Sequence, residues 1–592
     1  MKSIKIIQLA TIILYFCSQN VSAQYNTLWI PDTLTGPTFN LTLKDTFAQL
    51  RPTGNQTITG GVNTSKFWGP TLIMNKDQAV QMNVTNKLND STTIHWHGMH
   101  IPAIMDGGPY QIIPQNTIWS PHWTVKNQAF TGWYHPHLHE MTQEHLTKGV
   151  GGFIIVRDTE EGALAIPRKY GVDDIPLALT SRRFLTGNIM AYNVIDNYGD
   201  YELVNGTPNP QITLPKQVVR MRILNAEVQR GYNLGFSDNR TFYVIGNDQG
   251  LLNSPIAVTR MAIQTGERYE ILVDLGGDAL GSSIDLKAYN SATELTLLTP
   301  GQNPFGWPGN EGAPTTPTGN NGPLNGGLLN NINFNILHIN IGATTINAIT
   351  TIPASLVNNT YLTLADVTNP VTRTINVTGG QGGTVFTLNN LAYNQATTNQ
   401  NINLDAVEKW TIVNNNIFGH AFHIHDVAFK IISRSGGNMG STLRPYEQGW
   451  KDVVWLPIDG SVTFLAKFND FADATWPYMF HCHALTHEDE GMMGTFKVTG
   501  ASVLAVDTNM PISDFTIHPN PGKDRIFINF TDADSKAYYI KIFDAVGRTI
   551  FMLPVPELGE GIDVSTLPSG VYSLHLTDNN TKCVLTKKFI IE

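Results

Sequence analysis

HCHALTHEDEGM, from His481 to Met492, is the stretch that decides the fold. Its one cysteine, Cys482, lies between two histidines, and a third, His487, follows five residues later. A thiolate, imidazoles and a weak axial thioether are the ligands of a blue-copper electron-transfer site. Neighbouring side chains of an extended chain point to opposite faces. Cys482 would therefore face one metal centre, and His481 and His483 a second one.

A second metal centre predicts paired histidines elsewhere, and the chain has three more such clusters. They read HWHG from His95, YHPH from Tyr134 and HAFHIH from His420. Together with the first stretch, the clusters hold ten of the seventeen histidines. In a strand, histidines two positions apart emerge on one face. The pattern therefore indicates metal ligation rather than scattered surface histidines.

In this order the four clusters resemble those of the multicopper oxidase family, close to its bacterial laccase and cuprous-oxidase branch. The resemblance covers roughly residues 25–500 and implies four copper ions: one type 1, one type 2 and two type 3. It implies that His420, Cys482 and His487 hold the type 1 copper. Met492 is the expected axial ligand, and the adjacent Met493 is the alternative.

The same resemblance implies the ligands of the other three copper ions. The type 2 copper would take His95 and His423. The type 3 pair would take six histidines: His97, His135, His137, His425, His481 and His483. Other histidines near the clusters match no ligand position: His100, His122, His139 and His145.

Two acidic residues match positions that the family associates with proton supply to dioxygen, Asp106 and Glu488. A carboxylate beside a cationic cluster can pass protons through water. The alternatives are a turn aspartate in Asp106-Gly-Gly-Pro109 and a solvated acid in Glu488-Asp-Glu490.

Composition favours an all-β chain, because glycine is abundant, at 52 residues, and only 15% of residues are charged. The resemblance implies three cupredoxin-like Greek-key β-sandwich or barrel domains, to which we add a small C-terminal β-sandwich. The predicted boundaries are a signal peptide, 1–23; domain 1, 24–165; domain 2, 166–340; domain 3, 341–500; a linker, 501–513; and the C-terminal domain, 514–592. Domain 2 carries no metal motif and is expected to act as a spacer, and residues 301–331 are expected to form a long surface loop.

The ends of the chain indicate export. A positively charged start, an apolar run and the small residues Val21-Ser-Ala23 are typical of a secretory signal. Its removal leaves only Cys482 and Cys583, so the exported chain has no clear disulfide framework, and Cys482 is better explained as a metal ligand. Residues 514–592 resemble the C-terminal sorting domain of the type IX secretion system; an ordinary accessory β-sandwich is the alternative. We expect a secreted or outer-membrane surface protein of a bacterium, with the periplasm as the alternative.

The sequence leaves the reducing substrate open. A laccase-like oxidase of phenols and aromatic amines is the first hypothesis, with dioxygen as electron acceptor. A cuprous-ion oxidase for copper tolerance is the second, although residues 300–400 contain none of the methionines that would suit cuprous ion. Bilirubin oxidase and a non-catalytic surface copper-binding protein remain alternatives. A net charge of −10 without a basic run argues against nucleic-acid binding, and no apolar run is long enough for a confident membrane span.

Overall fold

The computed structural model describes most of the chain as two compact units, residues 1–501 and 502–592. The described residues are 25–192, 198–291, 328–329, 332–367, 372–380, 385–416, 419–436, 441–500, 515–530, 538–544, 549–554, 561–578 and 584–592. The predicted signal peptide, the linker 501–513, nearly all of the loop 301–331 and Cys583 lie outside them. Within the described residues, none of the helices has the length and apolar character to cross a membrane.

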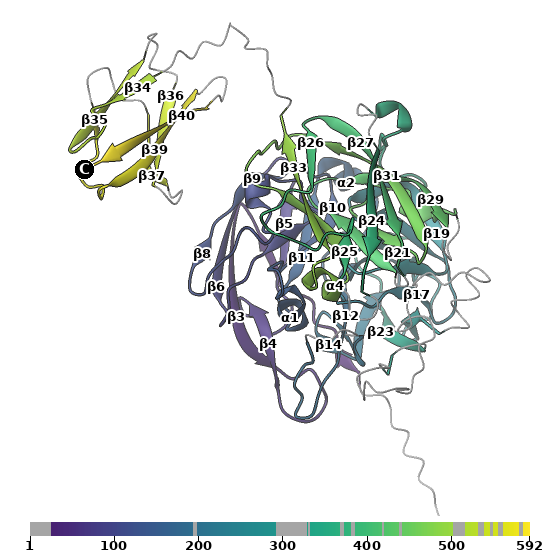
Figure 1. Ribbon diagram of the computed structural model, residues 1–592. Coiled ribbons are helices and arrows are strands. Elements are labelled where there is room, and N and C mark those ends of the chain that lie inside the picture. The colour runs from purple at the N-terminus through teal and green to yellow at the C-terminus, as the bar shows by residue number, and fades with distance from the viewer. Residues whose placement is uncertain are drawn as a thin grey trace, which may run out of the picture. The chain divides into compact units, whose positions relative to one another are not determined.

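The first sandwich of the larger unit, coloured purple to blue in Figure 1, packs two sheets around one core. One sheet has the order β2 (Thr33–Thr35), β5 (Thr71–Asn75), β11 (Gly152–Arg157), β10 (Phe130–His135) and β7 (His95–His97). The other has the order β4 (Thr57–Val62), β3 (Thr38–Ala48), β6 (Ala79–Lys87) and β8 (Ile118–Trp119), and β9 (His122–Thr124) also pairs with β6. In β6 every second side chain is buried, Val80, Met82 and Val84 among them, as the period of a half-buried strand requires.

The second sandwich has a seven-stranded and a six-stranded sheet. The seven strands are β14 (Thr207–Pro208), β13 (Tyr201–Val204), β12 (Asp174–Arg182), β16 (Val218–Asn225), β21 (Arg268–Asp274), β18 (Phe242–Asn247) and β19 (Gly250–Val258). The six are β1 (Asn26–Thr27), β15 (Pro210–Pro215), β23 (Asn333–Gly342), β22 (Ser283–Tyr289), β17 (Tyr232–Phe236) and β20 (Met261–Ile263). Although β1 falls in the predicted domain 1, it therefore pairs into this second sandwich, through β15.

The third sandwich brings the last two histidine clusters into one sheet. That sheet has the order β26 (Gln400–Asn403), β33 (Met493–Thr499), β32 (Tyr478–Cys482), β28 (His420–Ile424) and β30 (Val453–Leu456). Its partner has the order β25 (Thr387–Leu388), β24 (Thr372–Thr378), β27 (Ala406–Asn414), β31 (Gly460–Phe468) and β29 (Phe429–Gly436). Aromatic side chains such as Trp410, Phe464 and Phe480 fill the space between the sheets.

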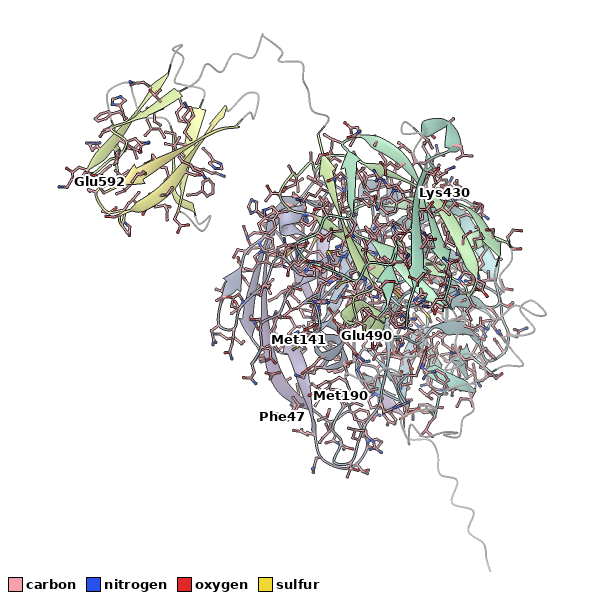
Figure 2. All side chains as sticks on the ribbon, in the orientation of Figure 1. Phe47, Met141, Met190, Lys430, Glu490 and Glu592 are labelled. Carbon is pink, nitrogen blue, oxygen red and sulfur yellow. The ribbon has the colours of Figure 1, made fainter. Side chains whose placement is uncertain are left out.

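Helices are few and short among the described residues. They are α1 (Thr142–Thr147), α2 (Thr159–Ala163), α4 (Leu485–Asp489) and the 3-10 turns η1 (Ala103–Met105), η3 (Leu364–Asp366) and η5 (Pro445–Glu447). Helix α1 packs against α4, because the backbone amides of Thr142 and Gln143 donate to the carboxylate of Asp489. Figure 2 labels the residues next to these two helices, Met141 and Glu490.

The smaller unit is a β-sandwich with its own core. One sheet has the order β34 (Phe515–His518), β35 (Arg525–Phe530) and β38 (Ile562–Asp563). The other has the order β37 (Thr549–Pro554), β36 (Tyr538–Phe543), β39 (Gly570–Asp578) and β40 (Val584–Ile591). Buried residues from both sheets, Phe515, Ile540, Leu574 and Phe589 among them, meet between them.

The all-β prediction is confirmed. Of the histidine pairs expected on strands, His95 and His97 both lie in β7, whereas β10 ends at His135, β28 at Ile424 and β32 at Cys482. The short helix α4 was not predicted, and it directly follows the strand that carries Cys482.

Candidate metal centre

Strand pairing brings the four histidine clusters together from the first and third sandwiches. In the first sandwich, β10 is antiparallel to β7, and His135 lies opposite His95. In the third, β28 is antiparallel to β32, and His423 lies opposite His481. Directly paired residues point to the same face of a sheet. Each sandwich therefore presents a row of imidazoles, and the two rows meet: His137 and His425 are 3.2 Å apart at their Nε2 atoms.

One group of three imidazoles consists of His137, His425 and His481. Their Nε2 atoms are 3.1–3.2 Å apart. Each Nδ1 faces an oxygen acceptor: a Glu488 carboxylate oxygen at 3.3 Å for His137, an Asp106 carboxylate oxygen at 2.7 Å for His425, and the Cys482 carbonyl at 3.0 Å for His481. His425 and His481 donate their Nδ1 protons to these oxygens, whereas His137 Nδ1 lies near Glu488 without a hydrogen bond. With the ring proton assigned to Nδ1 in all three, three Nε2 lone pairs converge on one point.

A second group of three consists of His97, His135 and His483. His97 Nδ1 lies 3.4 Å from His135 Nε2 and 3.3 Å from His483 Nε2. His135 donates its Nδ1 proton to the carbonyl of Pro136. His97 is reversed relative to the other rings, since its Nε2 faces a carboxylate oxygen of Asp452 at 3.3 Å.

His95 and His423 complete the set of eight. The Nδ1 of His95 donates to the backbone carbonyl of Asp106 at 2.9 Å, and that of His423 to the carbonyl of Asp452 at 2.8 Å. Both Nε2 atoms are buried and have no hydrogen-bond partner among the described residues. Each ring stacks on a neighbour from the other sandwich, His95 on His425 and His97 on His423.

These imidazoles fit metal ions. Lone pairs that converge within 3.1–3.4 Å repel one another, and a buried nitrogen without a partner loses its hydration. A cation bound at these points would attract the converging lone pairs and give the buried nitrogens a partner. Imidazole nitrogen is a ligand of copper, zinc, iron and nickel, and the neighbouring thiolate site favours copper.

The neighbouring site consists of Cys482, His420 and His487. Cys482 Sγ lies 3.4 Å from His420 Nδ1 and 3.5 Å from His487 Nδ1, and these two nitrogens are 3.1 Å apart. All three side chains are buried or nearly so. Burial raises the pKa of the Cys482 thiol to about 12. A thiolate at neutral pH therefore requires a bound cation here.

The register of β32 and β33 separates the two methionines. Met493 pairs directly with His481, so its side chain lies on the face opposite to that of Cys482. Met492 lies in the same buried cluster as Cys482. The structure therefore places Met492, not Met493, on the thiol side.

The two predicted acids are both buried in the histidine cluster. Asp106 ends the turn η1, and its carboxylate accepts from His425. Gly107 follows it with φ +80°, where a Cβ would lie 1.7 Å from the Ile94 carbonyl oxygen. Glu488 is fully buried in α4 and lies within 3.3 Å of both His137 and His481. A solvated surface acid at position 488 is therefore ruled out.

The surrounding histidines also shift the pKa values of these carboxyl groups. Burial alone would raise the pKa of Asp106, but His425 and His95 outweigh it and hold the pKa well below its usual range. In the same way, burial is outweighed at Glu488 by His137 and His481, which lower its pKa to about 2. Both groups are therefore carboxylates in the metal-free protein at neutral pH.

Sequence reasoning missed a second layer of residues around the imidazoles. Asp452 contacts both His97 and His423 and is itself held by Arg268 and Gln249 of the second sandwich. No motif marked these three residues, because each lies alone in the sequence. Of the histidines expected not to be ligands, His100 pairs with Asp426 and Asp470 instead.

The metal-free protein is expected to lose stability in mild acid. Burial lowers the pKa of His487 to about 3, and burial together with His95 lowers that of His425 to about 3. The unfolded chain binds these protons near the ordinary pKa of 6.5, whereas the folded state does so only near pH 3. The free energy of unfolding should therefore fall as the pH drops below 6.5, by up to about 1.4 kcal/mol per pH unit for each such histidine.

The measurement is the thermal unfolding temperature of the copper-free protein at pH 7 and pH 5. Asp489 works against this trend. Burial raises its pKa to about 8, so the folded state binds one proton there more readily than the unfolded chain does. His487→Gln should reduce the pH dependence, and His122→Gln, at an exposed position, should leave it unchanged. An unfolding temperature that is equal or higher at pH 5 would contradict the account.

The comparisons with known proteins agree with this geometry. Two family models described as multicopper oxidase match residues 46–161 and 364–502. A third, described as a secretion system C-terminal sorting domain, matches residues 516–592. The predicted sorting domain is thereby confirmed.

Curated relatives and solved structures cover most of the chain. A bilirubin oxidase of Albifimbria verrucaria is 31% identical over 73% of this chain and 71% of its own length. A cell division protein FtsP of Xenorhabdus nematophila is 29% identical over 74% of this chain and 85% of its own. The crystal structure of the McoA multicopper oxidase from Aquifex aeolicus superposes with a TM-score of 0.69 at 27% identity, over 80% of this chain and all of that one. The chain thus belongs to the multicopper oxidase family, the copper oxidoreductases that use dioxygen as electron acceptor.

Proposed function

We propose that this protein is a laccase-like oxidase, which takes single electrons from phenols or aromatic amines and passes them to dioxygen. The observation that carries the proposal is the completeness of the site: a thiol with two imidazoles next to eight further imidazoles, all buried. When bound, copper supplies the one-electron oxidation of the substrate and the four-electron reduction of dioxygen to water.

The residues that we propose as ligands follow the grouping of the imidazoles. The type 1 copper would be held by His420, Cys482, His487 and Met492. The type 2 copper takes His95 and His423. The type 3 pair takes His97, His135 and His483 on one side and His137, His425 and His481 on the other.

Strand β32 links the two sites through the covalent chain. Cys482 belongs to the thiol site, and its neighbours His481 and His483 belong to the two groups of three imidazoles. The peptide backbone between them therefore offers electrons a path of only a few bonds. The Cys482 carbonyl also accepts from His481 Nδ1, which fixes that ring.

We propose that Asp106 and Glu488 supply the protons that dioxygen reduction consumes. Each contacts two imidazoles of the cluster, so each lies within reach of the place where dioxygen would react. Both side chains are buried. A carboxylate beside a cationic cluster can pass protons through water.

Two other substrates have specific support. The bilirubin oxidase of Albifimbria verrucaria is among the relatives, which makes a tetrapyrrole a second candidate. A cuprous-ion oxidase is the third, because the stretch from His481 to Met493 resembles that branch of the family. Against it stands the absence of methionine from residues 301–400. A binding role without catalysis is disfavoured because no proposed ligand position has been replaced.

We also propose the domain boundaries predicted from the sequence, and export to the outside of a bacterial cell. The sorting domain supports secretion by the type IX route, with the outer-membrane surface or the surrounding medium as the destination. The net charge of −10, without a basic run in the sequence, argues against a nucleic-acid partner.

Oxygen uptake by the copper-loaded protein tests the proposed function. We expect uptake with a phenolic substrate, and its loss in Cys482→Ser, because a hydroxyl is a far poorer copper ligand than a thiolate. Cuprous ion and bilirubin are compared under the same conditions. Rapid uptake with cuprous ion and little with phenols would overturn the laccase proposal.

The proton role of Glu488 is tested with Glu488→Gln, which keeps the size of the side chain and removes its ability to carry a proton. We expect oxygen turnover to fall by about 100-fold or more, as for other general acid–base groups, while copper content stays constant. The matched control is Glu490→Gln, at the exposed end of the same segment. Unchanged turnover of Glu488→Gln across the pH range would show that the assignment is wrong.

A further inference from the structure

Asp452 touches two imidazoles of the cluster from outside. It directly precedes β30, and its side chain is 1% exposed. One carboxylate oxygen lies 3.3 Å from His97 Nε2, and its backbone carbonyl accepts the Nδ1 proton of His423. One residue therefore faces the ring nitrogens of two imidazoles on the side away from their convergence point.

Arg268, the first residue of β21, holds this carboxylate from the second sandwich. Its two terminal nitrogens donate to the two carboxylate oxygens of Asp452, each at 2.6 Å. The guanidinium is fully buried and also donates to the carbonyls of Thr131, Gly266 and Asp248. All its donors are thus used, and its orientation is fixed.

Gln249 completes the shell of donors around Asp452. Its amide nitrogen lies 2.6 Å from the carboxylate oxygen that is remote from His97. The near oxygen accepts from Arg268 and faces His97, and the remote oxygen accepts from Arg268 and Gln249. Asp452 lies close enough to His97 and His423 to share a metal ion with them. Because both oxygens are already occupied by donors, we assign it to the outer layer instead.

Two glycine residues allow the three sandwiches of the larger unit to approach one another closely around Arg268. Gly98 follows His97 with φ +90°, and a Cβ there would lie 2.7 Å from the guanidinium of Arg268 and 3.2 Å from Asp452. Gly266, two residues before Arg268, has φ +81°, and a Cβ there would lie 2.7 Å from the ring of His483. Only glycine occupies this backbone region without strain and leaves the space free.

We infer that Arg268 is a positioning residue of the copper cluster. The two terminal nitrogens of its guanidinium hold the Asp452 carboxylate against His97. This contact keeps the His97 proton on Nε2 and presents Nδ1 to the metal. The inference rests on the proposed ligand set, in which His97 is the one type 3 ligand that turns Nδ1 inward. The second sandwich, expected to be a spacer, thus sets the geometry of a site to which it contributes no ligand.

Copper affinity of the full-length protein, measured by competition with a chelator, tests this role. Loss of an outer partner of a metal-ligating histidine typically lowers metal affinity about 10–100-fold. In Arg268→Gln, we expect part of the bound copper to be held with an affinity lowered by about this factor. Unchanged affinity for every copper ion would overturn the inference.

Arg222→Gln is the matched control. Arg222 is also buried in the second sandwich and holds an aspartate, Asp174, through two nitrogens, at 2.7 and 3.0 Å. It touches none of the proposed ligands. We expect it to lower the unfolding temperature without lowering copper affinity. If both variants lost copper affinity equally, Arg268 would have only a structural role, as the ion-pair partner of Asp452.

Gln249→Met keeps the test decisive if Arg268→Gln does not fold, and a double change tests the shared contact if it does. Gln249→Met removes one donor from Asp452 without leaving a buried charge unpaired, and it should lower copper affinity in the same direction but less. Asp452→Asn combined with Arg268→Gln should cost no more affinity than the larger single change, because the two residues act through one contact. Additive losses, or no loss in Gln249→Met, would contradict the role.

Failure of the proposed function would look different. In that case the unaltered protein would itself not hold one copper ion at Cys482 and three among the eight imidazoles. If the unaltered protein holds them and Arg268→Gln retains them with equal affinity, only the positioning role is wrong.

Discussion

Eight buried imidazoles whose lone pairs converge are the constraint on which the rest of the structure depends. The Nε2 atoms of His137, His425 and His481 lie within 3.2 Å of one another, and no arrangement of their protons satisfies all three, because each Nδ1 already faces an acceptor. Bound cations would relieve the repulsion between these lone pairs. The cluster also forces the first and third sandwiches together, since each contributes half of the imidazoles.

The surroundings of the cluster follow from that constraint. Each imidazole has to be turned so that one nitrogen faces inward. Backbone carbonyls, Asp106 and Asp452 accept outward protons, and Glu488 lies within 3.3 Å of the outward nitrogens of His137 and His481. These acceptors belong to the first and third sandwiches, as the rings do. Asp452 differs from the others because its own orientation depends on Arg268 and Gln249 of the second sandwich. All three sandwiches of the larger unit therefore take part in one site.

The sequence was informative where chemistry is concentrated in short motifs. The spacing of His481, Cys482 and His483 predicted two adjacent metal centres, and the paired histidines predicted strands that present both rings on one face. Composition and the family resemblance predicted the all-β fold. Asp452 and Arg268 could not be found in this way, because their contact joins positions 184 residues apart and neither residue stands in a recognisable motif. The resemblance already favoured Met492 over Met493, and the strand register adds that Met493 lies on the face opposite to that of Cys482.

Anomalous X-ray scattering from crystals of the copper-loaded protein, recorded at the copper absorption edge, tests the central claim most directly. The account predicts one copper peak beside Cys482, His420 and His487. It predicts three more among the eight imidazoles, with His97 bound through Nδ1 and Asp452 outside the coordination shell. Fewer peaks among the imidazoles, or a peak coordinated by the Asp452 carboxylate, would contradict it.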